Sequence, residues 1–361
     1  MGCFITNAVA LDDSIMQKGK LVTAGSKILE NFVAPFDATV VSRLSQNKYE
    51  ITGKTSMAEF GVFPFADNSD DVLGAVKAVM DDAVACALCN DLFGRYRKQA
   101  AENNCCYIHP TYGTVSRFGL IPSATSMDQI GIVCKNLSDG FTLLSKLAGN
   151  DPQDGAMFPE ESFDYVSDSK KIRVGIPQSI IQQAEAASRD AIESFAEKFQ
   201  SVDVTLEHFD VYKQVMYILS CAEISNNINR YDGVKFGYRS PSFRGLNELY
   251  VNTRTEGFGF DVKLTAIMGA MVLSQNQYVP YYEKALKIRR LIKESLPFDV
   301  CDIIVLPCQI SNNPYENLTL YALPALAGLP SVSFMYKGQG IQLIANAKNE
   351  NALLSAWEVC K

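Results

Sequence analysis

The stretch that decides the fold is PTYGTVSRFGL at Pro110–Leu120, which SMDQIG at Ser126–Gly131 follows closely. Further runs of the same motif-like character stand before and after this pair. They are TAGSKILENF at Thr23–Phe32, DATVVSRL at Asp37–Leu44, GKTSMAEFG at Gly53–Gly61, RYDGVKFGYR at Arg230–Arg239, TRTEGFG at Thr253–Gly259, YYEKALKIRRLIK at Tyr281–Lys293 and LAGLP at Leu326–Pro330. Any one run is weak evidence, but their number and their order along the chain make coincidence negligible.

In this order the runs resemble the amidase signature family along most of the chain. The section with RYDG and TEGFG resembles in particular the A subunits of glutamyl-tRNA(Gln) amidotransferases, because general amidases lack it. The resemblance implies an α/β fold in one domain, residues 1–361, with a mixed central β-sheet covered by helices on both faces. It also implies truncation at the N-terminus, where the family's helical part is missing, and the loss of a segment of the active-site loop.

The chain's own pattern also predicts an α/β fold, because helix and strand signals alternate along it. Apolar residues at helical intervals predict a helix over Val72–Leu88, and similar spacing predicts a final helix over Glu350–Val359. Short apolar runs predict buried strands at Ile172–Ile176, Asp302–Leu306, Val332–Met335 and Ile341–Ala345.

Composition bounds the class of protein. With 47% apolar and 20% charged residues, the chain is an ordinary globular protein. No apolar run reaches the ~18 residues of a membrane span, and no signal peptide opens the chain. A net charge of −7 argues against direct nucleic-acid binding. We therefore expect a protein that is neither secreted nor in a membrane, and that lies in the cytoplasm or an organelle interior.

Ten cysteines raise the question of a metal site. Cys86 and Cys89 form a C-x-x-C pair, and Cys105 and Cys106 are adjacent. A structural zinc site needs four ligands in tetrahedral geometry, and vicinal cysteines rarely both reach one ion. The first pair also falls in the predicted helix. We interpret the cysteines as buried free thiols in a reducing compartment, and we expect no metal and no cofactor.

The family's Ser–cis-Ser–Lys triad does not match this chain at any of its three positions. The resemblance places the Lys on Asp12, within LDDSI, and the nucleophilic Ser on Arg95, within CNDLFGRYRK at Cys89–Lys98. It places the cis-Ser on Asp71, within NSDDVL at Asn68–Leu73. A Ser hydroxyl is a poor nucleophile without an adjacent base, so the loss of both groups implies the loss of the reaction.

The substrate-binding parts differ in the same way. The glycine-rich turn that forms the family's oxyanion hole falls on Leu92, Phe93 and Gly94, and the large side chains there should fill the space that a substrate needs. The family's charged groups for an amino-acid substrate fall on Thr265 and Leu318, whereas a pocket tyrosine is retained as Tyr217.

Three functions follow as hypotheses. The first is a catalytically inactive amidase-like protein that acts as a structural or regulatory subunit, with protein partners such as amidotransferase B- and C-like subunits. The second is a functional A subunit of a glutamyl-tRNA(Gln) amidotransferase, or another amidase, that uses displaced residues, with Ser56, Ser69 and Ser123 as candidate hydroxyls. The third is an RNA- or ribonucleoprotein-associated scaffold that uses the basic helix around Lys287 and Arg290.

The resemblance also predicts what replaces the triad. Its three positions converge in the family, so Arg95 should pair with Asp12, Asp70 or Asp71 and fill the former active site as a structural bridge. The alternative is that Arg95 points into solvent.

Overall fold

Ten strands form one mixed sheet in the computed structural model, which describes residues 7–62, 71–168 and 171–361. The strand order is β2-β1-β3-β5-β4-β9-β10-β8-β6-β7. Strands are parallel at the two ends of the sheet and antiparallel between β3 and β8. The bounds are β1 Ala8–Asp12, β2 Glu50–Thr55, β3 Cys86–Asn90, β4 Cys106–His109, β5 Ile130–Cys134, β6 Arg173–Ile176, β7 Gln200–Asp203, β8 Ile303–Pro307, β9 Ser331–Tyr336 and β10 Gln339–Ala345.

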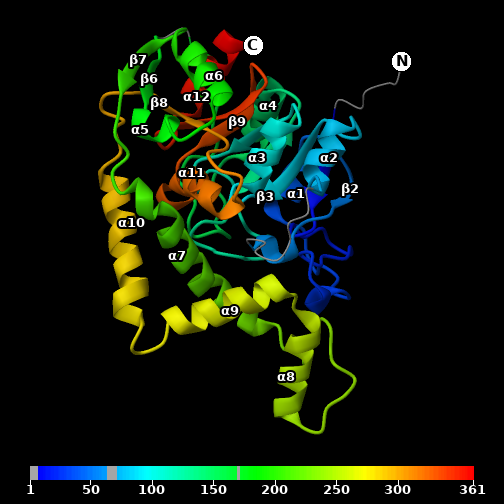
Figure 1. Cartoon of the computed structure of the whole chain (residues 1–361). Helices are drawn as coiled ribbons and strands as arrows, with labels where there is room; N and C mark the ends of the chain where they lie inside the picture. Colours follow the sequence, from blue (N-terminus) through cyan, green and yellow to red (C-terminus); the bar gives the residue numbers. More distant parts are fainter. Residues whose placement is uncertain (1–6, 63–70, 169–170) are drawn as a thin grey trace.

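Helices cover both faces of this sheet (Figure 1). Side chains alternate between the faces, so that Val9 and Leu11 of β1 join one apolar cluster while Ala8 and Ala10 join another. The first cluster is completed by α1 Thr39–Gln46, α4 Leu137–Leu147, α6 Ala186–Ala196 and α12 Glu350–Cys360. The opposite face is covered by α2 Gly74–Met80, α3 Arg95–Glu102 and α11 Pro314–Ala327, with α5 Gln178–Ile181 and α7 Tyr212–Asn227 alongside. The predicted mixed sheet with two helical layers is confirmed.

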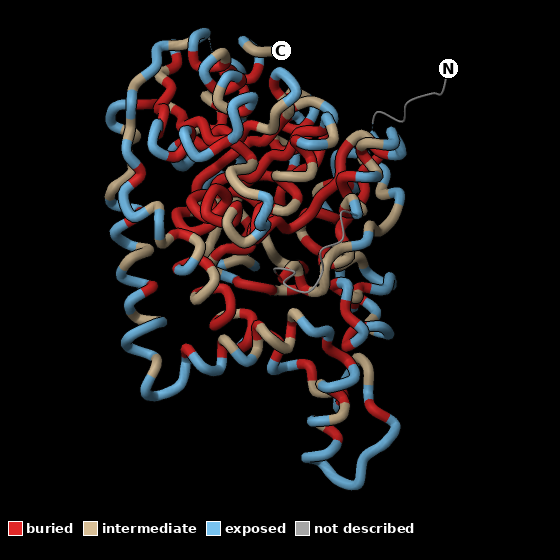
Figure 2. Tube along the Cα trace, in the orientation of Figure 1, coloured by how far each residue is buried: buried red, intermediate tan, exposed pale blue. Residues whose placement is uncertain are grey.

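A helical extension lies beside this layered body. It contains α8 Leu246–Gly257, α9 Phe260–Val272 and α10 Lys284–Glu294, and α9 packs along α7. Figure 1 shows α8 projecting away from the body. Figure 2 shows buried residues concentrated in the sheet and its covering helices, whereas α8 and α10 are mostly exposed.

Most of the predicted elements are confirmed, but one is wrong. The strands β6, β8, β9 and β10 and the helix α12 lie within a few residues of their predicted bounds. The predicted helix over Val72–Leu88 is instead α2, which ends at Met80, followed by β3, which begins at Cys86. Asp82 stands between them with a φ of 57°, which ends the helix. Since β3 is buried on both faces, its apolar run carries no alternation that would distinguish it from a helix.

The nine cysteines that the structure describes are free thiols, and eight of them are buried. Cys86 and Cys89 lie in β3 rather than in a helix. Within the described ranges, no group of three His, Cys, Asp or Glu side chains is arranged to hold a metal ion. In the same ranges, no helix combines the length and the hydropathy that a membrane crossing requires.

Candidate functional site

The turn between β3 and α3 is built around a buried ion pair. The Asp91 carboxylate accepts hydrogen bonds from the backbone N–H groups of Tyr96 at 3.2 Å and Arg97 at 2.9 Å, and so caps the first turn of α3. The Arg97 Nε also donates to Asp91 at 3.0 Å, and its Nη1 donates to the carbonyl of Tyr321 at 3.1 Å. Both charged groups are almost completely inaccessible to solvent. This pair fixes the turn on which the family's nucleophile would stand.

Gly94 makes the same turn possible by its lack of a side chain. Its φ is 81°, in the left-handed region, and a Cβ there would lie 2.1 Å from the Cγ atom of Tyr321. Asp91, Gly94 and Arg97 thus have structural roles that explain their presence in a turn without a nucleophile.

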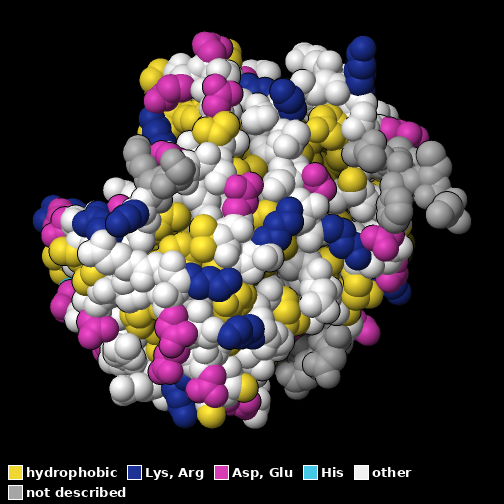
Figure 3. Space-filling view, turned by 90° about the horizontal axis from the view of Figure 1, so that it is seen from above, with side chains coloured by type: hydrophobic (Ala, Val, Ile, Leu, Met, Phe, Trp, Pro, Cys, Tyr) yellow, Lys and Arg dark blue, Asp and Glu magenta, His cyan; other side chains and the backbone are white. Residues whose placement is uncertain are grey.

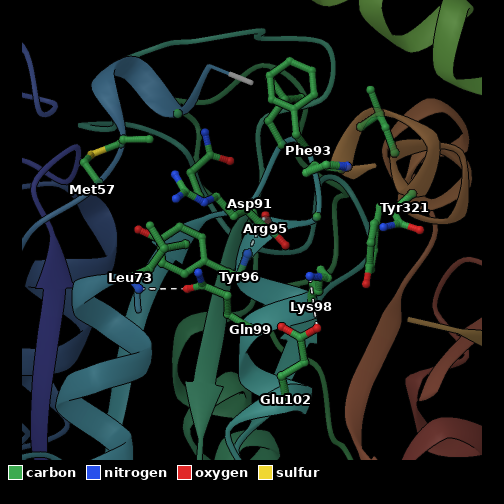
Figure 4. Close-up of a pocket in the computed structure, with 18 of the residues that line it drawn as sticks. Met57, Leu73, Asp91, Phe93, Arg95, Tyr96, Lys98, Gln99, Glu102 and Tyr321 are labelled. Atoms are coloured by element: carbon green, nitrogen blue, oxygen red, sulfur yellow. Dashed lines mark hydrogen bonds and ion pairs between the residues drawn. The ribbon is translucent and has the colours of Figure 1, made fainter. Parts of the chain in front are cut away.

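A cavity of about 530 Å³ opens at this turn, between α3, α11 and the segment after β2. Figure 4 shows Arg95, Tyr96, Lys98 and Gln99 of α3 around it, with Phe93 and Tyr321 on the opposite side from Met57. Leu92 and Phe93 are buried and also line it. A substrate carbonyl at this turn would therefore meet apolar side chains.

Asp12 ends β1 and is fully buried. Its Oδ2 accepts a hydrogen bond from the Tyr96 hydroxyl at 3.0 Å, and its Oδ1 accepts one from the backbone N–H of Asp13 at 3.0 Å. Asp12 is absent from the residues that line the cavity. Burial raises the pKa of Asp12 to about 7, although the hydrogen bond from Tyr96 opposes this shift.

Lys54 of β2 is a lysine close to Asp12, the position that the resemblance assigns to the family's lysine. It donates a hydrogen bond from Nζ to the carbonyl of Ile15 and lies close enough to Asp12 and Asp13 to be influenced by their charges. Burial lowers the pKa of Lys54 to about 8, and the two carboxylates act against that shift. Sequence reasoning singled out neither Tyr96 nor Lys54.

The three positions that the resemblance assigns to the triad do not all line the cavity. Arg95 lines it, Asp12 lies buried next to Tyr96, and Asp71 is exposed. Gln99 holds the backbone at this last position, since its side chain contacts the Asp71 carbonyl at 3.1 Å and the Leu73 N–H at 2.8 Å.

The predicted bridge joins Arg95 to one of three carboxylates, of which the structure describes Asp12 and Asp71. Among the described residues, no ion pair joins Arg95 to Asp12 or Asp71, and Asp12 is paired with Tyr96 instead. The third candidate, Asp70, lies outside the described residues.

The positions that the resemblance assigns to substrate binding are also separated. Leu318 of α11 is buried and lines the cavity, while Thr265 is buried in α9 against α7. Tyr217 of α7 lies edge-on to the ring of Tyr315, with ring centroids 6.3 Å apart, and it does not line the cavity. Of these three residues, only Leu318 lines the cavity, and its side chain carries no charge that could bind an amino acid.

The displaced hydroxyls have structural partners or exposed positions. The Ser123 hydroxyl donates to the carbonyl of Phe60 at 2.7 Å, and this side chain is buried. Ser56 is exposed after β2, and Ser69 lies outside the described residues. No described contact joins Ser56 or Ser123 to a lysine side chain.

This chain is similar to known proteins in sequence and in fold. The Amidase family model matches residues 8–82 and 73–354. The chain is 36% identical to the A subunit of the glutamyl-tRNA(Gln) amidotransferase of Lachnoclostridium phytofermentans, over 90% of this chain and 74% of that protein. It is 34% identical to the protein of the same description from Desulfosudis oleivorans, over 97% of this chain and 82% of the relative.

Solved structures agree in fold. The crystal structure of the A subunit of the glutamyl-tRNA(Gln) amidotransferase from Thermotoga maritima matches with a TM-score of 0.76 and 25% identity, over 96% of this chain and 81% of that one. The 6-aminohexanoate cyclic dimer hydrolase matches with a TM-score of 0.79 at 15% identity, over 98% and 84% of the two chains, and so shares the fold. The chain belongs to the amidase family.

Proposed function

We propose that this protein has lost amidase catalysis and serves as a structural or regulatory subunit of a protein complex. The observation that carries the proposal is the pairing of Asp12 with Tyr96 in the core, together with Arg95 on the turn that would present a nucleophile. Amide hydrolysis in this family needs a hydroxyl and a base at these places, and both have been replaced by groups that serve the fold.

No described group at the turn can take over the role of nucleophile. Leu92, Phe93 and Arg95 carry neither hydroxyl nor thiol. The nearest hydroxyl, on Tyr96, is buried, and burial raises its pKa well above its usual range, so it is a neutral phenol at pH 7. The base position, Asp12, can accept a proton but lies outside the lining of the cavity.

The binding machinery supports the same proposal. An amino acid is held through charge-assisted hydrogen bonds to its carboxylate and ammonium groups. Thr265 and Leu318 carry no charge, and Leu92 and Phe93 present apolar surface at the former oxyanion turn.

A binding role is supported by the outer face of α9. Val262, Thr265, Gly269 and Val272 are buried on the side that packs along α7. On the other side, Phe260 and Ile267 are 65% and 66% exposed, and Met271 is also exposed, at helical spacing. A helix that is apolar on both sides is typical of one that is covered by another element.

The relatives of this chain indicate which kind of partner to expect. The relatives at 34–36% identity are described as A subunits, which implies assembly with other chains. We therefore propose protein partners of the B- and C-like type in a reducing compartment, either the cytoplasm or an organelle interior, in keeping with the free cysteines.

Co-expression with the B- and C-like subunits of the same genome tests the partner half of the proposal. We expect co-elution in size exclusion for the wild type and for Val359→Glu, which changes an exposed residue of α12. Ile267→Glu should abolish co-elution without changing the thermal unfolding of the isolated chain. Wild-type elution as a lone monomer, or equal behaviour of the two variants, would reject the proposed complex or its proposed surface.

A further inference from the structure

The segment 233–257, which we call the arm, consists of a loop and helix α8. Figure 1 shows it extending away from the layered body. Residues 233–247 contain Lys235, Arg239 and Arg244 and no acidic residue, although the whole chain has a net charge of −7. The tip of the arm is therefore a local basic site on an acidic protein.

The three cations of the arm are available to a ligand. All of them are exposed, and none forms an ion pair with another residue in the part of the chain that the structure describes. The two acids that flank these residues in sequence, Asp232 and Glu248, accept hydrogen bonds from the backbone N–H groups of Val234 and Arg244 rather than from the cations.

Each cation stands next to an aromatic residue, in the couples Lys235–Phe236, Tyr238–Arg239 and Phe243–Arg244. The Arg239 guanidinium lies 5.1 Å from the centroid of the Phe243 ring, and the Phe236 and Phe243 side chains are 41% and 39% exposed. Tyr238 is already engaged, since its hydroxyl donates to Glu256 and the Lys27 ammonium lies 4.2 Å from its ring centroid. Phe236 also packs against Phe32, with ring centroids 5.3 Å apart, so a ligand would meet only the exposed part of its ring and the part of Phe243 that Arg239 leaves open.

The other basic stretch, helix α10, differs in this respect. Lys287 pairs with Glu283 at 2.6 Å, and Arg290 pairs with Glu294 at 3.2 Å, each one turn away on the same side of the helix. These i,i+4 pairs neutralise Lys287 and Arg290, the two cations that the sequence offered for RNA binding. The face of the molecule seen in Figure 3 likewise mixes acidic and basic side chains.

We propose that the arm binds single-stranded nucleic acid. The cations at Lys235, Arg239 and Arg244 would contact phosphates, and bases would stack on Phe236 and Phe243. Cations and partly exposed rings alternate over residues 235–244. This pattern matches a nucleic-acid strand, in which phosphates and bases also alternate. Binding here is independent of whether the cavity at α3 is catalytic.

Fluorescence anisotropy with labelled oligo(U) and oligo(dT) at about 50 mM salt tests the proposal. The variant Lys235→Ala/Arg244→Ala removes two charges from the arm, and Lys287→Ala/Arg290→Ala removes two from α10 as the matched control. We expect the arm variant to weaken binding at least about tenfold and to reduce the slope of log affinity against log salt by about 1.4, whereas the control changes neither.

Phe243→Ala separates stacking from charge. It should weaken binding about tenfold while leaving the salt slope unchanged, because no phosphate contact is removed. Preference for oligo(U) over oligo(dT), or the reverse, identifies the natural strand. Absence of wild-type binding, equal losses in the two double variants, or competition by polyglutamate at the same charge concentration would overturn the proposal, the last by indicating an acidic protein instead.

Discussion

The Tyr96 hydroxyl donates a hydrogen bond to Oδ2 of Asp12 across 3.0 Å, and both side chains are buried. Asp12 stands where the resemblance places the family's lysine, and Tyr96 directly follows the position of the nucleophile. Residues from two segments that the resemblance assigns to catalysis thus contact each other as parts of the core, and the backbone N–H of Asp13 also donates to the carboxyl group.

Replacing Tyr96 by Phe should destabilise the fold by about 1–3 kcal/mol, because a buried carboxyl would lose its side-chain donor. Urea unfolding at pH 8 measures this loss. Tyr107→Phe is the matched control, since Tyr107 is equally buried but its hydroxyl makes only a long contact, 3.5 Å, with the Cys89 carbonyl. Equal losses in the two variants would show that the Asp12 contact contributes nothing specific.

The pH dependence of stability should report Asp12 directly. Its pKa is about 7 in the folded chain against an ordinary value of 3.8, so the folded state holds a proton that the unfolded state releases between these values. Stability contributed by this group therefore falls as pH rises from about 4 to 7, by up to roughly 4 kcal/mol, and is constant above that range.

Asp12→Asn isolates this effect from other titrating groups, because it keeps the shape and removes the charge. The difference in unfolding free energy between the variant and the wild type should grow in favour of the variant from pH 5 to pH 8. Parallel pH profiles for the two proteins would mean that Asp12 titrates normally.

Breaking the Asp91–Arg97 pair should be more costly than breaking an exposed pair on the same helix. Arg97→Met leaves a buried carboxylate without its partner, and we expect a loss of about 3–5 kcal/mol in chemical unfolding. Lys98→Ala, which removes an exposed pair with Glu102, should cost no more than about 0.5 kcal/mol. Comparable losses would indicate that α3 is not anchored by Asp91.

Restoring the family's triad residues should not restore the reaction. The variant Asp12→Lys/Asp71→Ser/Arg95→Ser returns the reactive groups, but position 71 is exposed and position 12 lies outside the cavity lining. Rate enhancement depends on positioning and on a preorganised oxyanion site, and Leu92 and Phe93 remain in its place. Substantial glutamine turnover by this variant would show that the old geometry survives.

The sequence predicted the fold well because the motif runs and the strand signals agree along the chain. It failed at Val72–Leu88, where the turn at Asp82 and a strand buried on both faces mimic one long helix. Burial on both faces removes the alternation on which such a prediction depends.

The candidate site was predicted in part. The positions of Leu92, Phe93 and Leu318 at the cavity follow from the motif alignment. The Asp12–Tyr96 contact joins residues 84 positions apart, and no local pattern encodes it. The sequence predicts that Arg95 pairs with Asp12, Asp70 or Asp71. Of these, Asp12 contacts Tyr96 instead, because a buried carboxyl with a raised pKa can be satisfied by a neutral hydroxyl.

Ammonia release from glutamine, measured with the B- and C-like subunits present, tests the central claim most directly. We predict release at the rate of the enzyme-free control for the wild type, unchanged by Tyr96→Phe or Ser123→Ala. Release above that rate that disappears on changing one of these residues would contradict the loss of catalysis.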